Sequence, residues 1–324
     1  MKALQINNPG DFDVKEVPMP TPGPGEILLR VLAVTTCPHW DMHILGGEPM
    51  FPGTELHYPY TLGQPGHEAC GDIAAVGEGV TRLAAGDRVA SWIDPGHDKP
   101  GCYAQYVVKP AEHVIHVPAE LPPEACAPFE LATCAAAFLV QVERIETIQG
   151  KRVGVFGLGP AGLVFIQLAL AAGAVEVVGF DPLPERRTLA TQLGAAKVID
   201  AASPEAEAFP RCFTPGCLDI AFDCVGAPAV ARRAMEVTNH VVSLFAVQRE
   251  PYVFEQHCWG RMTLTARGPQ DFSTAEYVAK RLTEGKLDLG PLVTRKMPLQ
   301  DYAQGVELLR KREATKIAFM PQES

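Results

Sequence analysis

The sequence has little positive charge. Its 28 lysines and arginines are outnumbered by 38 aspartates and glutamates, which gives a formal net charge of −10 at pH 7. The sequence pI is about 5.4. Proteins that bind nucleic acids or anionic membranes usually present a basic face. We therefore expect neither kind of partner for this chain.

Long apolar segments are also missing. Even the apolar run of residues 163–178 is interrupted by Gln167, Gly173 and Glu176, whereas a membrane-spanning helix needs about 20 apolar residues. The N-terminal sequence MKALQINNPGDF lacks the apolar core of a signal peptide. We therefore expect no membrane association and a cytoplasmic location.

A disulfide framework is not indicated either. The nine cysteines are an odd number and are scattered through the chain. Disulfide frameworks are typical of short secreted chains with an even number of cysteines. The cysteines are therefore predicted to be reduced thiols.

The chain is long enough for two domains and a substantial core. It has 324 residues, of which 47% are hydrophobic and 20% charged, as is usual for a soluble globular protein. Its first third combines Gly–Pro clusters with short strand-like runs, which indicates a compact β-rich domain. The predicted strands are residues 26–34, 69–76, 88–92 and 103–108. The alanine-rich segment of residues 124–142 is predicted to be helical.

From residue 152 the pattern changes to strands that alternate with helices, which predicts a doubly wound parallel sheet with helices on both faces. The predicted strands are residues 152–156, 175–180, 197–200, 218–223, 240–245 and 262–266. The predicted helices are residues 184–193, 275–284 and 299–312, with a last strand at 316–320. The fold class is therefore α/β plus a β-rich domain.

A glycine-rich turn follows the strand of residues 152–156. Its residues, in the spacing G-x-G-x-x-G, are Gly157, Gly159, Pro160, Ala161 and Gly162. The first glycine permits a tight turn, the second lets the backbone approach a pyrophosphate, and the third allows close helix–strand packing. Because an acid, Asp181, ends the next strand about 20 residues later, the motif predicts a dinucleotide-binding site.

Three side chains in the β-rich part are suited to a metal. Cys37, His67 and Glu68 offer a thiolate, an imidazole and a carboxylate, which are ligands of Zn²⁺. Taken singly, such a cysteine is usually a buried thiol, and a histidine beside a glutamate is usually on the surface. Their joint occurrence ahead of a dinucleotide-binding fold favours a zinc site.

The chain resembles the medium-chain dehydrogenase/reductase superfamily, in particular its zinc-dependent alcohol and polyol dehydrogenases. The matching stretches are V-x-A-V-x-x-C ending at Cys37, G-x-P-G-H-E-x-x-G-x-I-x-x-V-G at Gly63–Gly77, G-D-R-V at Gly86–Val89, G-L-G-P-A-G at Gly157–Gly162 and F-D-C-V-G at Phe222–Gly226. The resemblance covers nearly the whole chain. It implies a GroES-like catalytic domain of residues 1–130 and 276–324 and a Rossmann NAD-binding domain of residues 131–275.

The resemblance also implies roles for single residues. Cys37 and His67 match the first two ligands of the family's catalytic zinc, and Glu68 matches the acid that lies beside the metal. The third ligand lies within residues 126–134: Glu130 matches the polyol-dehydrogenase version, with Cys134 and Cys126 as alternatives. Thr133 lies where the family places a side chain under the nicotinamide.

Cofactor choice depends on the end of the second Rossmann strand. A carboxylate there, Asp181, accepts hydrogen bonds from the adenosine 2′-hydroxyl and repels a 2′-phosphate, which favours NAD over NADP. Arg186 and Arg187 follow closely and either favour a phosphate or face solvent.

The sequence departs from the family in two places. The family has a hydroxyl residue two positions after the first zinc cysteine, where the proton relay begins, but this chain has Cys37-Pro-His39-Trp-Asp41. His39 either transfers the proton itself, since histidine titrates near neutral pH, or shapes the pocket, or the site carries out reductive chemistry that needs a different relay. His43 either matches the family's downstream relay histidine or is a solvated surface histidine. The second departure is the structural zinc lobe, because Cys102 is the only cysteine of residues 90–110. We therefore expect one catalytic zinc and no structural zinc.

The resemblance implies a zinc-dependent enzyme that transfers a hydride between an alcohol or polyol and NAD. Two alternatives are a zinc-free quinone or enoyl reductase of the same superfamily and a dinucleotide-binding sensor without turnover. The substrate pocket is expected to include Trp40 and residues 48–60, 92–99 and those near Phe245. The family's oligomers predict a homodimer or homotetramer, with the strand at 262–266 as the candidate edge.

Overall fold

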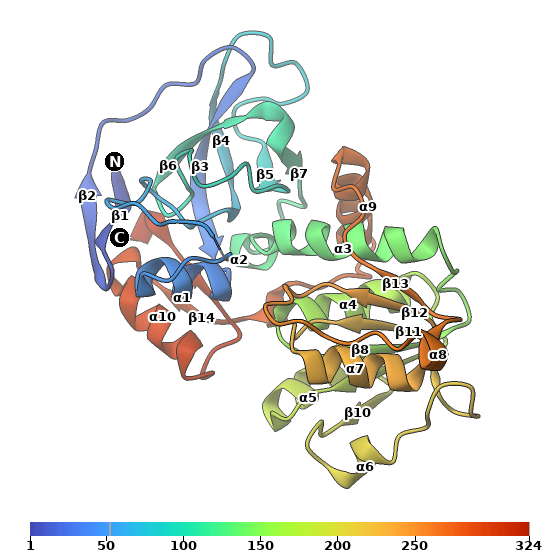
Figure 1. Cartoon of the computed structure of the whole chain (residues 1–324). Coiled ribbons are helices and arrows are strands. Elements are labelled where there is room, and N and C mark those ends of the chain that lie inside the picture. Colours follow the sequence, from blue (N-terminus) through green and yellow to red (C-terminus); the bar gives the residue numbers. More distant parts are fainter. Residues whose placement is uncertain (52, 324) are drawn as a thin grey trace. The chain divides into compact units, whose positions relative to one another are not determined.

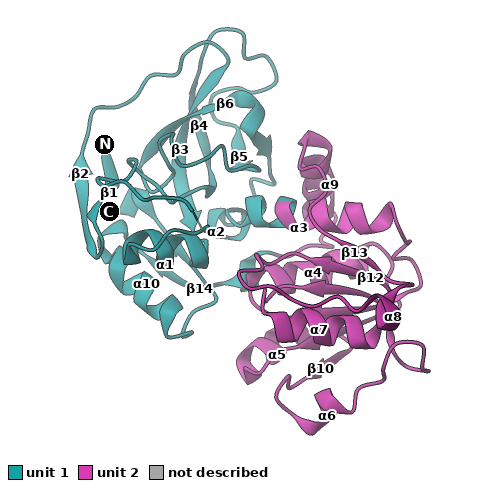
Figure 2. Ribbon diagram, in the orientation of Figure 1, with its two compact units in different colours: residues 1–133, 289–324 teal, residues 134–288 magenta. Residues whose placement is uncertain are grey.

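The computed structural model describes residues 1–51 and 53–323, so Pro52 of the predicted pocket loop lies outside the described residues. The chain divides into two compact units (Figures 1 and 2): unit 1 comprises residues 1–133 and 289–324, and unit 2 comprises residues 134–288. The predicted domain limits, 130/131 and 275/276, differ from these by three residues at the first boundary. At the second boundary, residues 276–288 were assigned to the catalytic domain but lie in unit 2. They include most of the helix Phe272–Thr283.

Unit 1 contains a seven-stranded sheet with the order β14-β15-β3-β4-β5-β7, in which β6 also pairs with β3, and a separate hairpin of β1 and β2. The strands are β1 (Lys2–Asn8), β2 (Asp11–Glu16), β3 (Glu26–Thr35), β4 (Glu68–Val76), β5 (Arg88–Ser91), β6 (Tyr106–Pro110), β7 (Val114–His116), β14 (Val293–Met297) and β15 (Lys316–Phe319). The central strand β3 alternates little and is buried on both faces along most of its length. The C-terminal strands β14 and β15 therefore complete the sheet that the N-terminal part begins.

The helices of unit 1 are α1 (Pro38–Gly46), α2 (Pro123–Cys126), the first turn of α3 (Phe129–Glu143) and α10 (Tyr302–Arg310). Helix α1 begins directly after β3, because Pro38 occupies its first turn, where a missing N–H costs little. It ends at Gly47, which adopts a left-handed conformation with φ 77°. The core beneath these helices includes Tyr103, Tyr302 and Phe319, whose rings contact one another.

Unit 2 is a six-stranded parallel sheet with the order β10-β9-β8-β11-β12-β13. Its strands are β8 (Arg152–Phe156), β9 (Glu176–Phe180), β10 (Lys197–Ile199), β11 (Leu218–Asp223), β12 (Thr238–Leu244) and β13 (Thr263–Thr265). Its helices, besides most of α3, are α4 (Pro160–Ala171), α5 (Pro184–Gln192), α6 (Pro204–Glu207), α7 (Pro228–Val237), α8 (Gln256–Trp259) and α9 (Phe272–Thr283). The order changes direction at β8, where a doubly wound sheet binds its ligand.

The segment predicted to be helical, residues 124–142, is also the longest apolar helical segment of the described residues. Residues Pro123–Glu143 are long and apolar enough to cross a membrane, but 72% of their most apolar window is buried inside the protein. The segment also breaks at Ala127 and Pro128 into helices α2 and α3. The apolar character of this segment is therefore explained by burial in the core of the protein.

Candidate metal centre and cofactor site

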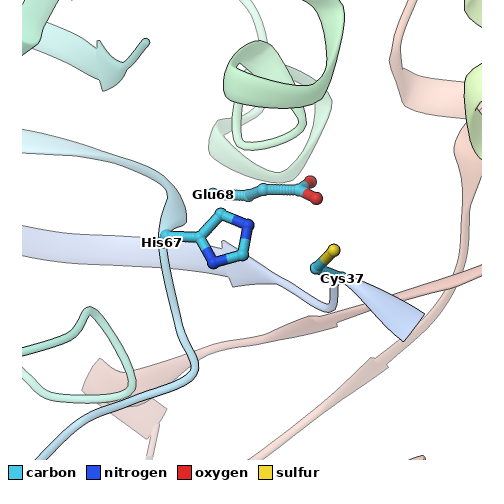
Figure 3. Close-up of side chains that lie close together, drawn as sticks. All are labelled: Cys37, His67 and Glu68. Carbon is cyan, nitrogen blue, oxygen red and sulfur yellow. The ribbon is translucent and has the colours of Figure 1, made fainter. Parts of the chain in front are cut away.

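The pairing of β3 with β4 brings two predicted ligands together. In this antiparallel register Thr35 lies opposite Glu68, so Cys37, two residues beyond the end of β3, faces His67 just before β4. The ligand atoms of Cys37, His67 and Glu68 all lie within 4.8 Å of one another (Figure 3). Residues separated by about 30 positions in the chain thus converge because an antiparallel strand pair places them at one end.

The carboxylate of Glu68 is held by its own partners. Lys316 Nζ lies 2.6 Å from one of its oxygens and 2.5 Å from the other, and Thr35 Oγ1 donates to Oε2 over 2.8 Å. The Lys316 and Glu68 side chains are each 1% exposed. Lys316 also donates to the carbonyl oxygen of Thr36. Glu68 therefore belongs to the cluster, but its charge is neutralised by Lys316, a lysine that no sequence motif singles out.

The group placed best to complete a ligand set is Glu130, in the first turn of α3. Its Oε2 lies 3.8 Å from His67 Nε2, and its side chain is 7% exposed. His67 Nδ1 lies 2.9 Å from the carbonyl oxygen of Pro65, which can only accept, so Nδ1 carries a proton and Nε2 faces the cluster. A thiol, an imidazole nitrogen and a carboxylate are thus available from Cys37, His67 and Glu130.

The electrostatics of the cluster favour a cation. Burial lowers the pKa of His67, but the neighbouring Cys37, Glu130 and Asp94 raise it by more, so that the pKa lies well above 6.5. Burial raises the pKa of the Cys37 thiol, although the hydrogen bond with His67 opposes this. The acidic groups that stabilise a proton on His67 are the groups that a divalent cation would neutralise, with release of that proton. The residues present therefore fit a zinc ion.

The two alternative third ligands have other partners. The thiol of Cys126 forms a hydrogen bond with the thiol of Cys70, which lowers the pKa of Cys126. Cys134 lies in unit 2, where its sulfur is 3.6 Å from Gln270 Oε1. The choice among the three stays a prediction, and these contacts favour Glu130.

The predicted relay residues lie on helix α1. His39 is exposed there, and the His43 side chain is 13% exposed with Nδ1 3.9 Å from Glu48 Oε2. Among the described residues, neither histidine belongs to a group of ligand atoms around His67. Asp41 on the same helix points into the core, where Oδ1 accepts hydrogen bonds from Tyr103 and Tyr302 over 2.7 and 2.8 Å. The catalytic roles of His39 and His43 stay predictions.

A second polar group borders His67. Asp94 Oδ2 lies 3.9 Å from His67 Nδ1 and 3.4 Å from His97 Nε2. Burial raises the pKa of Asp94, but His97, His67 and the backbone N–H of Gly96 lower it more, so the carboxyl is ionised. The sequence analysis placed residues 92–99 at the pocket but assigned no role to Asp94 or His97. The pattern that could have indicated them is an acid and a histidine in the segment where the family has its cysteine cluster.

The other predicted pocket and cofactor residues are divided between the units. In unit 1, Trp40 and Tyr60 contact His97, and Thr133 Oγ1 lies 2.6 Å from the Trp92 carbonyl oxygen and 2.7 Å from that of Glu130. In unit 2, Phe245 contacts Phe138 and Phe165. Thr133 therefore ties the start of α3 to the loop after β5.

The glycine turn has the packing that its spacing predicts. Gly157 has φ 88°, and a Cβ there would lie 2.6 Å from Val225 Cγ2. A Cβ on Gly162 would lie 1.9 Å from the carbonyl oxygen of Gly157, whereas one on Gly159 would meet only Arg186 Nη1, at 3.9 Å. The turn is thus tightly packed at its first and third glycines and open at its second, at the start of α4. An open backbone at a helix N-terminus fits a pyrophosphate.

Asp181 connects the turn to the second strand of the sheet. Its Oδ2 accepts from Leu158 N over 2.8 Å, and its Oδ1 accepts from Leu183 N over 2.9 Å. Arg186 Nη1 lies 3.7 Å from Oδ2, and Arg187 donates to the Asp181 carbonyl oxygen. A carboxylate has about four acceptor sites, so Asp181 keeps capacity for a ribose hydroxyl.

Two family models match the chain. The first, described as the alcohol dehydrogenase GroES-like domain, covers residues 23–119, and the second, described as zinc-binding dehydrogenase, covers residues 160–251. Together they include the predicted ligands Cys37 and His67 and the glycine turn from Pro160 onward. The zinc-free and non-catalytic alternatives are not favoured by these matches.

Whole-length relatives agree with the models. L-threonine 3-dehydrogenase of Bacillus licheniformis is 27% identical, with 99% of both chains covered, and (R,R)-butanediol dehydrogenase of Bacillus subtilis is 28% identical, with 99% of this chain and 100% of the relative covered. The crystal structure of 2R,3R-butanediol dehydrogenase from Bacillus subtilis has a TM-score of 0.81 at 27% identity, with 99% of each chain covered. That of the alcohol dehydrogenase from Thermus sp. ATN1 has a TM-score of 0.80 at 26% identity, again over 99% of each. The chain belongs to the zinc-dependent medium-chain dehydrogenase/reductase superfamily, as an alcohol dehydrogenase-like oxidoreductase that transfers a hydride between an alcohol or polyol and a nicotinamide cofactor.

Proposed function

We propose that Cys37, His67 and Glu130 hold one catalytic zinc, and that the chain oxidises a small or medium alcohol or polyol with NAD. The observation that carries this proposal is the convergence of a thiol, an imidazole and buried carboxylates around His67. When bound, zinc would supply Lewis-acid chemistry at the substrate oxygen, and the nicotinamide would supply hydride transfer.

Other residues of the chain position the ligands and transfer the proton. The Pro65 carbonyl oxygen orients the His67 ring by accepting a hydrogen bond from Nδ1–H. Lys316 holds Glu68 beside the ligands without leaving an unpaired buried charge. We assign the movement of the alcohol proton to histidines of unit 1, with His39 and His43 as the candidates from the sequence, because no hydroxyl residue follows Cys37.

Preference for NAD is supported by the position of Asp181. Its carboxylate lies at the end of β9, where it would accept hydrogen bonds from a ribose hydroxyl and repel a phosphate. Arg186 beside it partly offsets that repulsion. We propose NAD as the main cofactor.

We propose that the protein is a cytoplasmic homodimer or homotetramer that joins through β13, which ends the sheet of unit 2. The nine free thiols are in keeping with a reducing compartment. Light scattering should give a mass of two or four chains of 34.9 kDa. The mass of a single chain would contradict the assembly.

Metal analysis tests the ligand set. Purified protein should contain about one zinc per chain, because the chain lacks the cysteines of a second, closed four-ligand site. Cys37→Ser and Glu130→Gln should lose most of it, whereas Cys126→Ser and Cys134→Ser serve as matched controls and should keep it. Zinc lost from Cys134→Ser but kept in Glu130→Gln would assign the third ligand to the cysteine. A zinc-free protein that oxidises no alcohol with NAD⁺ would refute the function.

A further inference from the structure

Two buried thiols of unit 1 contact each other outside the proposed ligand set. Cys70 lies in β4 and Cys126 ends α2, and both residues are fully buried. Helix α2 packs against β3 and β4, and the two thiols form a hydrogen bond across this contact. Thiols in direct contact are placed so that a disulfide needs little movement of the backbone.

The two cysteines flank the segments that carry two of the proposed zinc ligands. Cys70 follows His67 by three residues, at the start of β4. Cys126 precedes Glu130 by four residues, at the end of α2. The ligand atoms His67 Nε2 and Glu130 Oε2 lie 3.8 Å apart. A bond between the two sulfurs would therefore tie one ligand segment to the other.

The two thiols differ in their surroundings. A hydrogen bond from the Cys70 thiol lowers the pKa of Cys126 more than burial raises it, and the nearby charge of Arg88 acts in the same direction. Burial raises the pKa of Cys70. Because the thiolate is the form that an oxidant attacks, Cys126 is the thiol that reacts first, and Cys70 is placed to close the bond.

Helix α2 is the element that can open to admit a small oxidant. It is a single turn, Pro123–Cys126, between Pro122 and Pro128, and prolines donate no backbone hydrogen bond. A turn this short opens at a lower free-energy cost than β4, which pairs with β3 on one side and β5 on the other. Opening of α2 therefore exposes Cys126 while Cys70 stays in the sheet.

We propose that Cys70 and Cys126 are an oxidation site at which hydrogen peroxide forms a reversible disulfide. The Cys126 thiolate attacks one peroxide oxygen, the O–O bond breaks, and the products are the Cys126 sulfenic acid and hydroxide. The Cys70 thiol then attacks the sulfenic sulfur, so that the S–S bond forms, the S–O bond breaks, and water leaves with the Cys70 proton. The two sulfurs supply the two electrons that reduce the peroxide. A dithiol reverses the reaction by thiol–disulfide exchange.

The disulfide should also act on the metal centre. Zinc can leave only when its ligands separate, and a bond between the segments of His67 and Glu130 limits how far they move apart. We therefore expect the oxidised protein to release zinc more slowly than the reduced protein. This consequence rests on the proposed ligand set, whereas formation of the disulfide does not.

Peptide mapping tests the oxidation site. Zinc-loaded protein is treated with hydrogen peroxide, its remaining thiols are blocked with iodoacetamide, and its peptides are analysed by mass spectrometry without reduction. We expect a linked pair of peptides that contain Cys70 and Cys126 and that dithiothreitol separates. Cys70→Ser should stop at the Cys126 sulfenic acid, which dimedone labels, whereas Cys126→Ser should leave Cys70 unoxidised.

Cys102→Ser is the matched control, because Cys102 is also fully buried in unit 1. It should form the linked pair as the wild type does, and thermal melting of the reduced proteins should show that all variants are folded. Transfer of zinc to the chelator EDTA gives the second measurement. Release should be about tenfold slower after oxidation of the wild type, because the cross-link restricts the opened state, and unchanged after the same treatment of Cys70→Ser.

The outcomes separate this inference from the proposed function. Peroxide treatment that leaves Cys70 and Cys126 unlinked, or that links either one to another cysteine, would overturn the oxidation site. A linked pair in a protein that binds no zinc would support the oxidation site and refute the proposed function. A linked pair in a zinc-containing protein, with equal release rates before and after oxidation, would overturn the effect on the metal centre.

Discussion

Lys316 and Glu68 form a buried ion pair in which the ammonium nitrogen lies 2.6 Å and 2.5 Å from the two carboxylate oxygens. The two residues are 248 positions apart in the chain. Lys316 begins β15, whose antiparallel pairing with β3 places Ala318 opposite Thr35 and thereby brings Lys316 level with Cys37. The C-terminal segment thus neutralises an acid beside Cys37 and His67, so the sheet of unit 1 needs strands from both ends of the sequence.

Removal of the lysine should be costly. Lys316→Met leaves the Glu68 carboxylate buried and uncompensated, and we expect a loss of about 3–5 kcal/mol in the free energy of unfolding. The double variant Lys316→Met/Glu68→Gln should recover much of that loss. The control is Lys296→Met, which breaks an ion pair with Glu124 whose lysine side chain is 59% exposed and should cost about 1 kcal/mol or less. Urea unfolding of metal-free protein measures all three; equal midpoints for the two single variants would contradict the prediction.

Asp41 should make stability depend on pH. Burial raises its pKa from 3.8 to about 6, although hydrogen bonds from Tyr103 and Tyr302 oppose the shift. Because the folded pKa exceeds the unfolded one, the stability from this group is complete below pH 3.8 and is lost as the pH rises through about 6. At about 1.4 kcal/mol per pKa unit, the loss is roughly 3 kcal/mol.

Asp41→Asn removes the ionisation while keeping an oxygen for the two tyrosines. Relative to wild type, this variant should therefore gain roughly 3 kcal/mol in unfolding free energy between pH 4 and pH 7. Urea denaturation across that range measures the difference. Asp98→Asn, with an exposed side chain, should follow the wild-type curve; a constant offset for Asp41→Asn at every pH would refute the assignment.

Gly159 and Gly162 should respond differently to alanine. At Gly162 the added carbon meets the Gly157 carbonyl oxygen at 1.9 Å, so the turn must shift and stability should fall by about 2 kcal/mol or more. At Gly159 the carbon meets only Arg186 Nη1 at 3.9 Å, so folding should be nearly unchanged while NADH affinity falls at least tenfold. Thermal melting and NADH fluorescence separate the two effects, and unchanged NADH affinity in Gly159→Ala would contradict a dinucleotide at this turn.

Asp181 and Arg186 should control the choice of cofactor in opposite directions. Asp181→Asn retains an acceptor for Leu158 N but removes the negative charge, so the ratio of kcat/KM with NAD⁺ to that with NADP⁺ should fall at least tenfold. Arg186→Gln should raise the same ratio, because it removes the nearby positive charge. Arg211→Gln, in another part of unit 2, provides the control. A ratio that changes in the same direction in both variants would refute the assignment.

Strand positions in unit 2 could be predicted closely because parallel strands buried on both faces are continuous apolar runs. Strands β8 and β11 have the predicted limits, residues 152–156 and 218–223. Helix α1 was not predicted, since Pro38–Gly46 holds two histidines and a buried aspartate and has no clear apolar stripe. Tertiary contacts stabilise this helix although its sequence does not predict it. They include the hydrogen bonds that Tyr103 and Tyr302 donate to Asp41.

The sequence by itself determined the fold class, the family, the glycine turn and the pair Cys37 and His67, because each depends on residue type at a short, fixed spacing. Only the tertiary structure decided that Lys316 neutralises Glu68, that Asp41 accepts hydrogen bonds from Tyr103 and Tyr302, and that Asp94 lies between His67 and His97. These groups come from strands and loops far apart in the chain. Their distances are set by strand register and by close backbone contacts such as that of Gly63 with Gly101, which no local sequence pattern encodes.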